Sequence, residues 1–127
     1  MSRPRVFISF QIKDSWAREF FLEGVREIPG DFEIVDHSIR YPFDSGWKDK
    51  CRPRIADTHG TVVLVGATTF ASAPVSWEIQ QTLLQGNELI GIQVQDGEIY
   101  RIPDNLSRRN VMRWDFVRLS SLISAWV

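Results

Sequence analysis

The sequence has a single cysteine, no long apolar run and no excess of charge of either sign. Cys51 alone cannot form an intramolecular disulfide. There is no run of about 18 apolar residues and no N-terminal apolar signal region, so neither a membrane span nor export is indicated. The formal net charge of -1 gives no global attraction for nucleic acid or an anionic membrane. We expect a soluble cytoplasmic protein without nucleic-acid or membrane partners.

The glycine-rich motifs that bind phosphate are also missing. Neither G-x-G-x-x-G nor G-x-x-x-x-G-K-[ST] occurs, which argues against Rossmann-type dinucleotide binding and P-loop hydrolysis. Residues 10–13 (FQIK) are not a flavin phosphate loop, and residues 64–66 (LVG) lack the aspartate of a phospho-receiver. The pairs Asp36-His37 and Asp57-Thr58-His59 lack H-x-x-x-H or C-x-x-C spacing, so turn and cap roles are favoured over metal binding. No bound cofactor and no metal are expected.

Five short apolar runs, each bounded by turn residues, predict five strands. With 43% hydrophobic residues the chain can build one well-packed core, and we expect residues 1–127 to form a single domain. The predicted strands are Arg5–Phe10, Phe32–Asp36, Gly60–Gly66, Glu88–Val94 and Asn110–Trp114.

The stretches between these runs carry apolar residues at helical spacing. The first helix spans Asp14–Ile28, with Asp14 or Ser15 as its N-cap. Pro53 lies inside the second helix and should kink or split it, whereas Pro74 suits a first turn and places the third helix near Ser72 to Gly86. The predicted buried stripes are Trp16, Phe20, Val25 and Ile28; Trp47, Cys51 and Ile55; Val75, Ile79 and Leu83; and Phe116, Leu119, Ile123 and Trp126.

The alternation of strands and helices predicts an α/β fold with right-handed crossovers. We expect a mostly parallel five-stranded sheet of order 2-1-3-4-5 with helices on both faces, the flavodoxin-like three-layer sandwich. In this topology the ligand crevice lies beyond the carboxyl ends of strands 1 and 3, at Gln11–Lys13 and Ala67–Ser72.

The segment Thr68 to Ile79 joins the crevice loop to the start of the third helix and places a carboxylate, Glu78, there. It lies one or two turns from the start of the third helix, about 100° round the helix from Ile79. It can face the crevice as a catalytic group, or it can complement the helix dipole, which is worth about 0.3–1 kcal/mol. Position alone does not separate these two roles. The alternating basic residues Lys48, Lys50, Arg52 and Arg54 predict a solvated helix face.

Four motifs in order carry a family resemblance: Arg5 to Phe10 (RVFISF), Asp44 to Trp47 (DSGW), Gly60 to Gly66 (GTVVLVG) and Trp77 to Ile79 (WEI). Together they resemble the TIR-like family of prokaryotic defence proteins, and especially the TIR component of Thoeris antiphage systems. Two positions depart from the family's pattern. Pro74 stands where the family often has tryptophan, and Gln11 stands where related proteins often have histidine.

The resemblance implies an enzyme that cleaves the nicotinamide–ribose bond of NAD. ADP-ribose, a cyclised isomer or a conjugate would then signal to a downstream effector in antiphage defence, and self-association is expected. Glu78 matches the family's catalytic glutamate. Nicotinamide leaves NAD as a neutral group, so one carboxylate can stabilise the oxocarbenium-like ribose, and NAD is the substrate and not a cofactor. The substrate-binding residues implied are Phe7, Ser9, Phe10, Gln11, Trp47, Ser72 and Trp77.

Two other functions remain open from the residues. One is a non-catalytic module that assembles through the Tyr41–Trp47 loop and neighbouring helix faces. The other is a nucleoside-processing enzyme of related fold, because such enzymes also break N-glycosidic bonds with a carboxylate. Turnover of NAD, of nucleosides or of neither distinguishes the three.

Overall fold

The computed structural model describes residues 3–28, 32–35 and 46–127 and contains a five-stranded sheet in which every pair of neighbouring strands is parallel. The strand order is β2-β1-β3-β4-β5, which confirms the predicted topology. The strands are β1 (Arg5–Ser9), β2 (Glu33–Val35), β3 (Gly60–Val65), β4 (Glu88–Gln93) and β5 (Val111–Arg113). The helices are α1 (Ser15–Glu27), α2 (Trp47–Ala56), α3 (Ala73–Leu84) and α4 (Phe116–Ser124), with 3-10 turns at Ile12–Asp14, Thr69–Ala71 and Arg108–Asn110.

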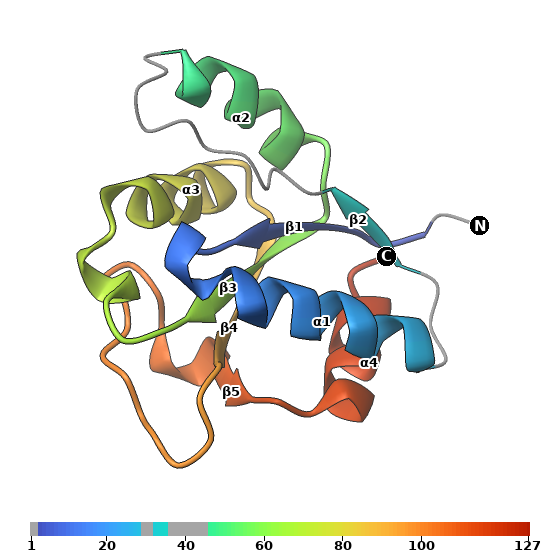
Figure 1. Ribbon diagram of the computed structural model, residues 1–127. Coiled ribbons are helices and arrows are strands. Elements are labelled where there is room, and N and C mark those ends of the chain that lie inside the picture. The colour runs from blue at the N-terminus through green and yellow to red at the C-terminus, as the bar shows by residue number, and fades with distance from the viewer. Residues whose placement is uncertain (1–2, 29–31, 36–45) are drawn as a thin grey trace.

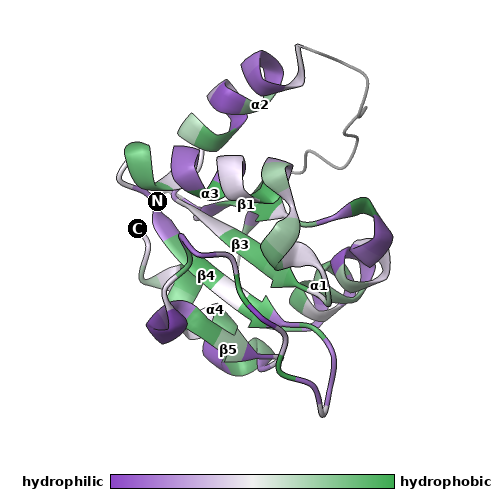
Figure 2. Ribbon diagram, turned by 90° about the vertical axis from the view of Figure 1, so that its left-hand side faces the viewer, coloured by the Kyte–Doolittle hydropathy of each residue, from purple (hydrophilic) through white to green (hydrophobic). Residues whose placement is uncertain are grey.

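Helices cover both faces of the sheet, as Figure 1 shows: α2 and α3 lie on one side, and α1 and α4 on the other. The alternating residues of β3 divide between the two faces. Val62 and Leu64 pack with α1 and α4, whereas Val63 and Val65 pack with α3. Figure 2 shows apolar colour concentrated on the central strands. Within the described residues, no helix is long and apolar enough to cross a membrane.

The buried face of α1 differs from the prediction. Trp16 is 48% and Phe20 45% exposed, whereas Ala17 and Phe21 are fully buried. The helix is therefore turned by about one residue, or roughly 100°, from the predicted orientation. The small Ala17 lets the helix backbone approach the sheet. The Phe20 ring packs edge-on against the Trp114 ring at the rim of the core, with ring centroids 4.8 Å apart.

Pro53 does not split α2, which runs without a break from Trp47 to Ala56. Cys51 and Ile55 are buried as predicted, and Pro53 is exposed. Because Pro53 has no backbone N–H group, the Asp49 carbonyl has no helical hydrogen-bond donor. Asp49 is also exposed, so water can donate to this carbonyl.

The start of α3 agrees with the prediction. The Ser72 side chain caps the helix by accepting a hydrogen bond from the Val75 amide at 3.2 Å, and Pro74 lies in the first turn. One residue of its predicted stripe is wrong, because Leu83 is 51% exposed and Thr82 is buried in its place. In α4, Leu119 and Ile123 are buried as expected.

Candidate functional site

Glu78 lies in the second turn of α3 and is completely buried against β1. Its oxygens accept hydrogen bonds from β1 and from α2. The Ser9 hydroxyl, at the end of β1, donates to Oε1 at 2.6 Å, and the Cys51 thiol of α2 donates to Oε2 at 3.6 Å. The carboxyl group is therefore inside the layer between the sheet and α2–α3, with no exposed surface, and its catalytic role stays a prediction.

A second pair of polar side chains fixes the position of α3 on the sheet. The Thr82 hydroxyl donates to the Glu78 carbonyl at 2.8 Å, and its oxygen lies 2.8 Å from the hydroxyl oxygen of Thr61 in β3. Because a hydroxyl has one hydrogen, Thr82 acts as the acceptor toward Thr61. Both threonines are fully buried, and their bonds hold the turn that carries Glu78.

An aromatic wall adjoins the Glu78 carboxyl group. Phe7, two residues before Ser9 on the same face of β1, packs with Cys51, and Trp47 and Trp77 pack against this cluster. The two indole rings meet edge to face, with centroids 5.0 Å apart. This arrangement brings together four predicted site residues, Phe7, Ser9, Trp47 and Trp77, around Glu78.

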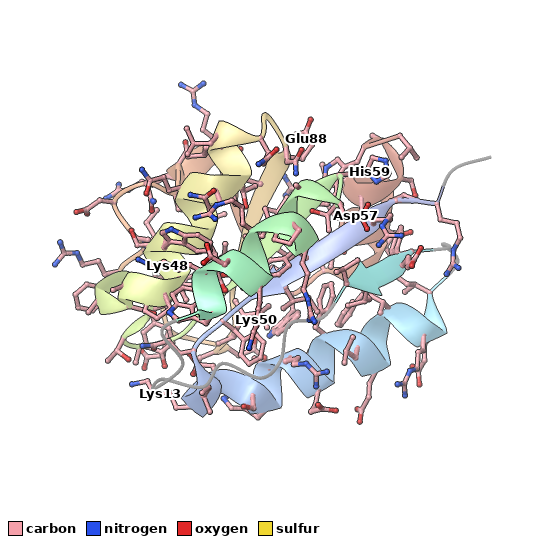
Figure 3. The ribbon with its side chains drawn as sticks, turned by 90° about the horizontal axis from the view of Figure 1, so that it is seen from above. Lys13, Lys48, Lys50, Asp57, His59 and Glu88 are labelled. Carbon is pink, nitrogen blue, oxygen red and sulfur yellow. The ribbon has the colours of Figure 1, made fainter. Side chains whose placement is uncertain are left out.

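Basic side chains of α2 border the tryptophan pair. Lys48 Nζ lies 5.9 Å from each of the Trp47 and Trp77 ring centroids, and the Arg52 guanidinium lies 5.6 Å from the Trp77 centroid. Figure 3 shows Lys48 and Lys50 projecting from α2. The basic residues of this helix are exposed, as predicted, so positive charge lies at the surface above a buried carboxyl group.

The other predicted residues lie outside this cluster. Phe10 is buried on the opposite face of the sheet, in the core formed with α1 and α4. Ser72 is the N-cap of α3. Gln11 accepts a hydrogen bond at 2.8 Å from the Thr68 hydroxyl, which joins the two loops at the carboxyl ends of β1 and β3. Tyr41 falls outside the described residues.

A buried aspartate lies at the same carboxyl ends. Asp14 is 7% exposed, and its Oδ2 atom accepts no hydrogen bond from the described residues. Burial raises the pKa of this carboxyl group above its usual value, while the charge of Lys13 and the hydroxyl of Thr69 act in the opposite direction. Gly66 leaves room for the carboxyl group, because a Cβ atom there would lie 2.4 Å from Oδ2.

Asp57 and His59, weighed as metal ligands, instead attach the start of β1. Arg5 donates its backbone amide to His59 Nδ1 at 2.9 Å and its guanidinium to Asp57 Oδ2 at 2.6 Å. Figure 3 shows both residues together, far from Lys13 at the other end of the sheet. Among the described residues, no group of three His, Cys, Asp or Glu side chains is placed to bind a metal ion.

Sequence reasoning missed the Cys51 contact and the two threonines. Cys51 is 27 residues from Glu78 and was assigned to the core stripe of α2, which it also occupies. A signal for Thr61 was present, since it is a polar residue in an otherwise apolar strand that is buried on both faces.

The fold and the site define a class: a parallel, flavodoxin-like α/β domain with a buried glutamate in the helix that follows β3. The model of the TIR-like domain of Thoeris protein ThsB matches residues 7–98, and the chain belongs to this family. The match confirms the resemblance indicated by the four motifs.

Solved structures are similar in fold. The Clostridium botulinum CMP N-glycosidase BcmB shares 15% identity with a TM-score of 0.56, over 95% of this chain and 98% of that chain. A 3-dehydroquinate dehydratase-like protein from Bifidobacterium longum shares 12% identity with a TM-score of 0.49, over 98% and 94% of the two chains. A search of curated protein sequences finds no match.

Proposed function

We propose that this protein cleaves the N-glycosidic bond between nicotinamide and ribose in NAD, with Glu78 as the catalytic carboxylate. The observation that carries the proposal is the placement of Glu78: a fully buried carboxyl group held by Ser9 and Cys51 in a TIR-like chain of the ThsB family. The released ADP-ribose product, linear, cyclised or conjugated, would act as a signal for a downstream effector in antiphage defence.

The chemistry needs one carboxylate. Nicotinamide is cationic in NAD and departs as a neutral molecule, so its departure requires no general acid. Positive charge develops on the ribose, and a carboxylate in a site shielded from water stabilises that charge more than it would in solution. Ser9 holds Oε1 in place, which lowers the cost of orienting the carboxylate during the reaction.

Access to Glu78 requires movement on the α2 side of the sheet, because no part of the side chain is exposed. Only Cys51 and Ile55 of α2 are fully buried, so this helix is attached by a small apolar contact. Outward movement of α2 would open the space between Trp47 and Trp77. Lys48 and Arg52 lie beside this pair and match the negative charge of the NAD diphosphate.

The direct test is to incubate the purified chain with NAD and to measure nicotinamide and the ribosyl product by chromatography and mass spectrometry. A range of protein concentrations is needed, because we propose that self-association completes the active form. Glu78→Gln should lower the rate by at least about 100-fold, the scale of losing one preorganised electrostatic group. Glu88→Gln removes an exposed carboxylate and is the matched control.

The outcomes separate the candidate functions. A Glu78→Gln protein that assembles normally and releases nicotinamide at the wild-type rate would show that Glu78 is not catalytic. CMP belongs in the assay because the structure is similar to that of a CMP N-glycosidase. Release of cytosine in preference to nicotinamide would favour nucleotide hydrolysis instead. Assembly without turnover of either substrate would favour a non-catalytic signalling module.

A further inference from the structure

A hollow of about 1130 Å³ lies at the carboxyl ends of β4 and β5, away from Glu78. Strands β3 and β4 separate β5 from β1, against which Glu78 packs, so the hollow and the buried carboxyl group are different sites. The long connection between β4 and β5 forms one wall, and Figure 1 shows it extending beyond the edge of the sheet. The volume suffices for a small organic ligand.

Hydrogen bonds make the floor of this hollow rigid. The side-chain amide of Gln93, which is 7% exposed, donates to the Tyr100 carbonyl at 2.8 Å and accepts from the Tyr100 amide at 2.9 Å. The Trp114 indole donates to the Val94 carbonyl at 2.8 Å. Gln93, Tyr100 and Trp114 all line the hollow, so the backbone of Tyr100 and the indole ring of Trp114 are held in place before any ligand binds.

Positive charge exceeds negative charge on the walls. Four arginines line the hollow, against two aspartates, whereas the whole chain carries a net charge of -1. Arg108, Arg113 and Arg118 form no ion pair with the described residues, and the Arg101–Asp104 contact is long at 3.8 Å. The other aspartate, Asp115, accepts the Arg118 backbone amide as the N-cap of α4.

We propose that this hollow binds a small organic phosphate that carries an aromatic group, such as a nucleoside monophosphate. The net charge of +2 from four arginines and two aspartates on the walls matches a phosphate dianion, and guanidinium groups recognise phosphate oxygens through paired hydrogen bonds. Tyr100 and the anchored indole of Trp114 provide a surface for the aromatic group. The site is independent of NAD cleavage at Glu78.

The test is a titration of the isotope-labelled full chain with AMP, followed by nuclear magnetic resonance. The five tryptophan indole signals report on different places. AMP should shift the Trp114 indole and the Gln93 side-chain amide, and adenosine should bind at least about tenfold more weakly. The affinity for AMP should fall as salt is raised, because the arginines are exposed.

Arg113→Gln/Arg118→Gln should weaken AMP binding by at least about tenfold, the effect of losing one to two phosphate contacts. Arg26→Gln removes an exposed arginine of α1 outside the hollow and should bind AMP as the wild type does. Arg108→Gln removes a positive charge from the 3-10 turn, leaves β5 and α4 unchanged, and should also weaken AMP binding.

Equal affinity for adenosine and AMP would overturn the proposal. So would unchanged affinity in the arginine variants, or shifts confined to the Trp47 and Trp77 indoles.

Discussion

The hydrogen bond between Ser9 and Glu78 can be tested by removing the serine hydroxyl in two backgrounds. Ser9→Ala leaves Glu78 Oε1 without the donor that lies 2.6 Å away in a fully buried site. A hydrogen bond to a charged group contributes about 1.5–3 kcal/mol, and the same bond to a neutral amide about 0.5–1.5 kcal/mol. We therefore expect Ser9→Ala to cost about 2 kcal/mol in the wild type and about 1 kcal/mol in a Glu78→Gln background.

Urea unfolding of the four proteins measures this coupling, and thermal unfolding gives a parallel value. For a chain of this length a loss of 2 kcal/mol lowers the melting temperature by roughly 8 °C. Ser121→Ala, on the exposed surface of α4, is the matched control and should change stability by less than about 0.5 kcal/mol. An equal cost of Ser9→Ala in both backgrounds would refute the reasoning, because the hydrogen bond to Glu78 would then be no stronger than the bond to a neutral amide.

The loops at the carboxyl ends of β1 and β3 give two further predictions. The raised pKa of Asp14 means that its contribution to stability is fully present below its unfolded value of 3.8 and is lost as pH rises through the folded pKa. Asp14→Asn should therefore gain stability relative to the wild type as pH rises from 4.5 to about 7.5, as measured by urea unfolding; a constant difference would contradict the raised pKa. Gly66→Ala should lower stability by about 1–3 kcal/mol, because its Cβ atom would lie 2.4 Å from Asp14 Oδ2. Thermal unfolding that matches the wild type would show that Asp14 moves aside freely.

The strand order could be predicted because each strand is a short apolar run and each connection is long enough for a helical crossover. The buried face of α1 could not be predicted from the sequence. Trp16 and Phe20 form one apolar line along the helix, and Ala17 and Phe21 form the next. Hydrophobicity alone favours the larger pair. The structure buries the pair that contains alanine, because close contact between helix and sheet depends on a small side chain as well as on apolar area.

The sequence predicted which elements carry the candidate site residues, but it did not predict how those elements pack together. Glu78 and Ser9 belong to motifs that the sequence displays, so their positions on α3 and β1 followed from the topology. The burial of Glu78 did not follow, because it depends on how α2 packs over the carboxyl group. Helix periodicity assigned Cys51 a place in the core and gave no information about the side chain that its sulfur contacts.

The polar residues around Glu78 are themselves an argument for function. Elsewhere on this face of the sheet β1 and β3 bury apolar side chains, such as Phe7 and Val63. The exceptions are Ser9 and Thr61, which contact Glu78 directly or through Thr82. Buried polar groups contribute less to stability than well-packed apolar groups of similar volume. A sequence shaped by stability alone would place an apolar residue at the position of Ser9, so the buried hydroxyl that donates to the Glu78 carboxyl group supports a chemical role for Glu78. Thr61 and Thr82 hold only the backbone carbonyl of Glu78.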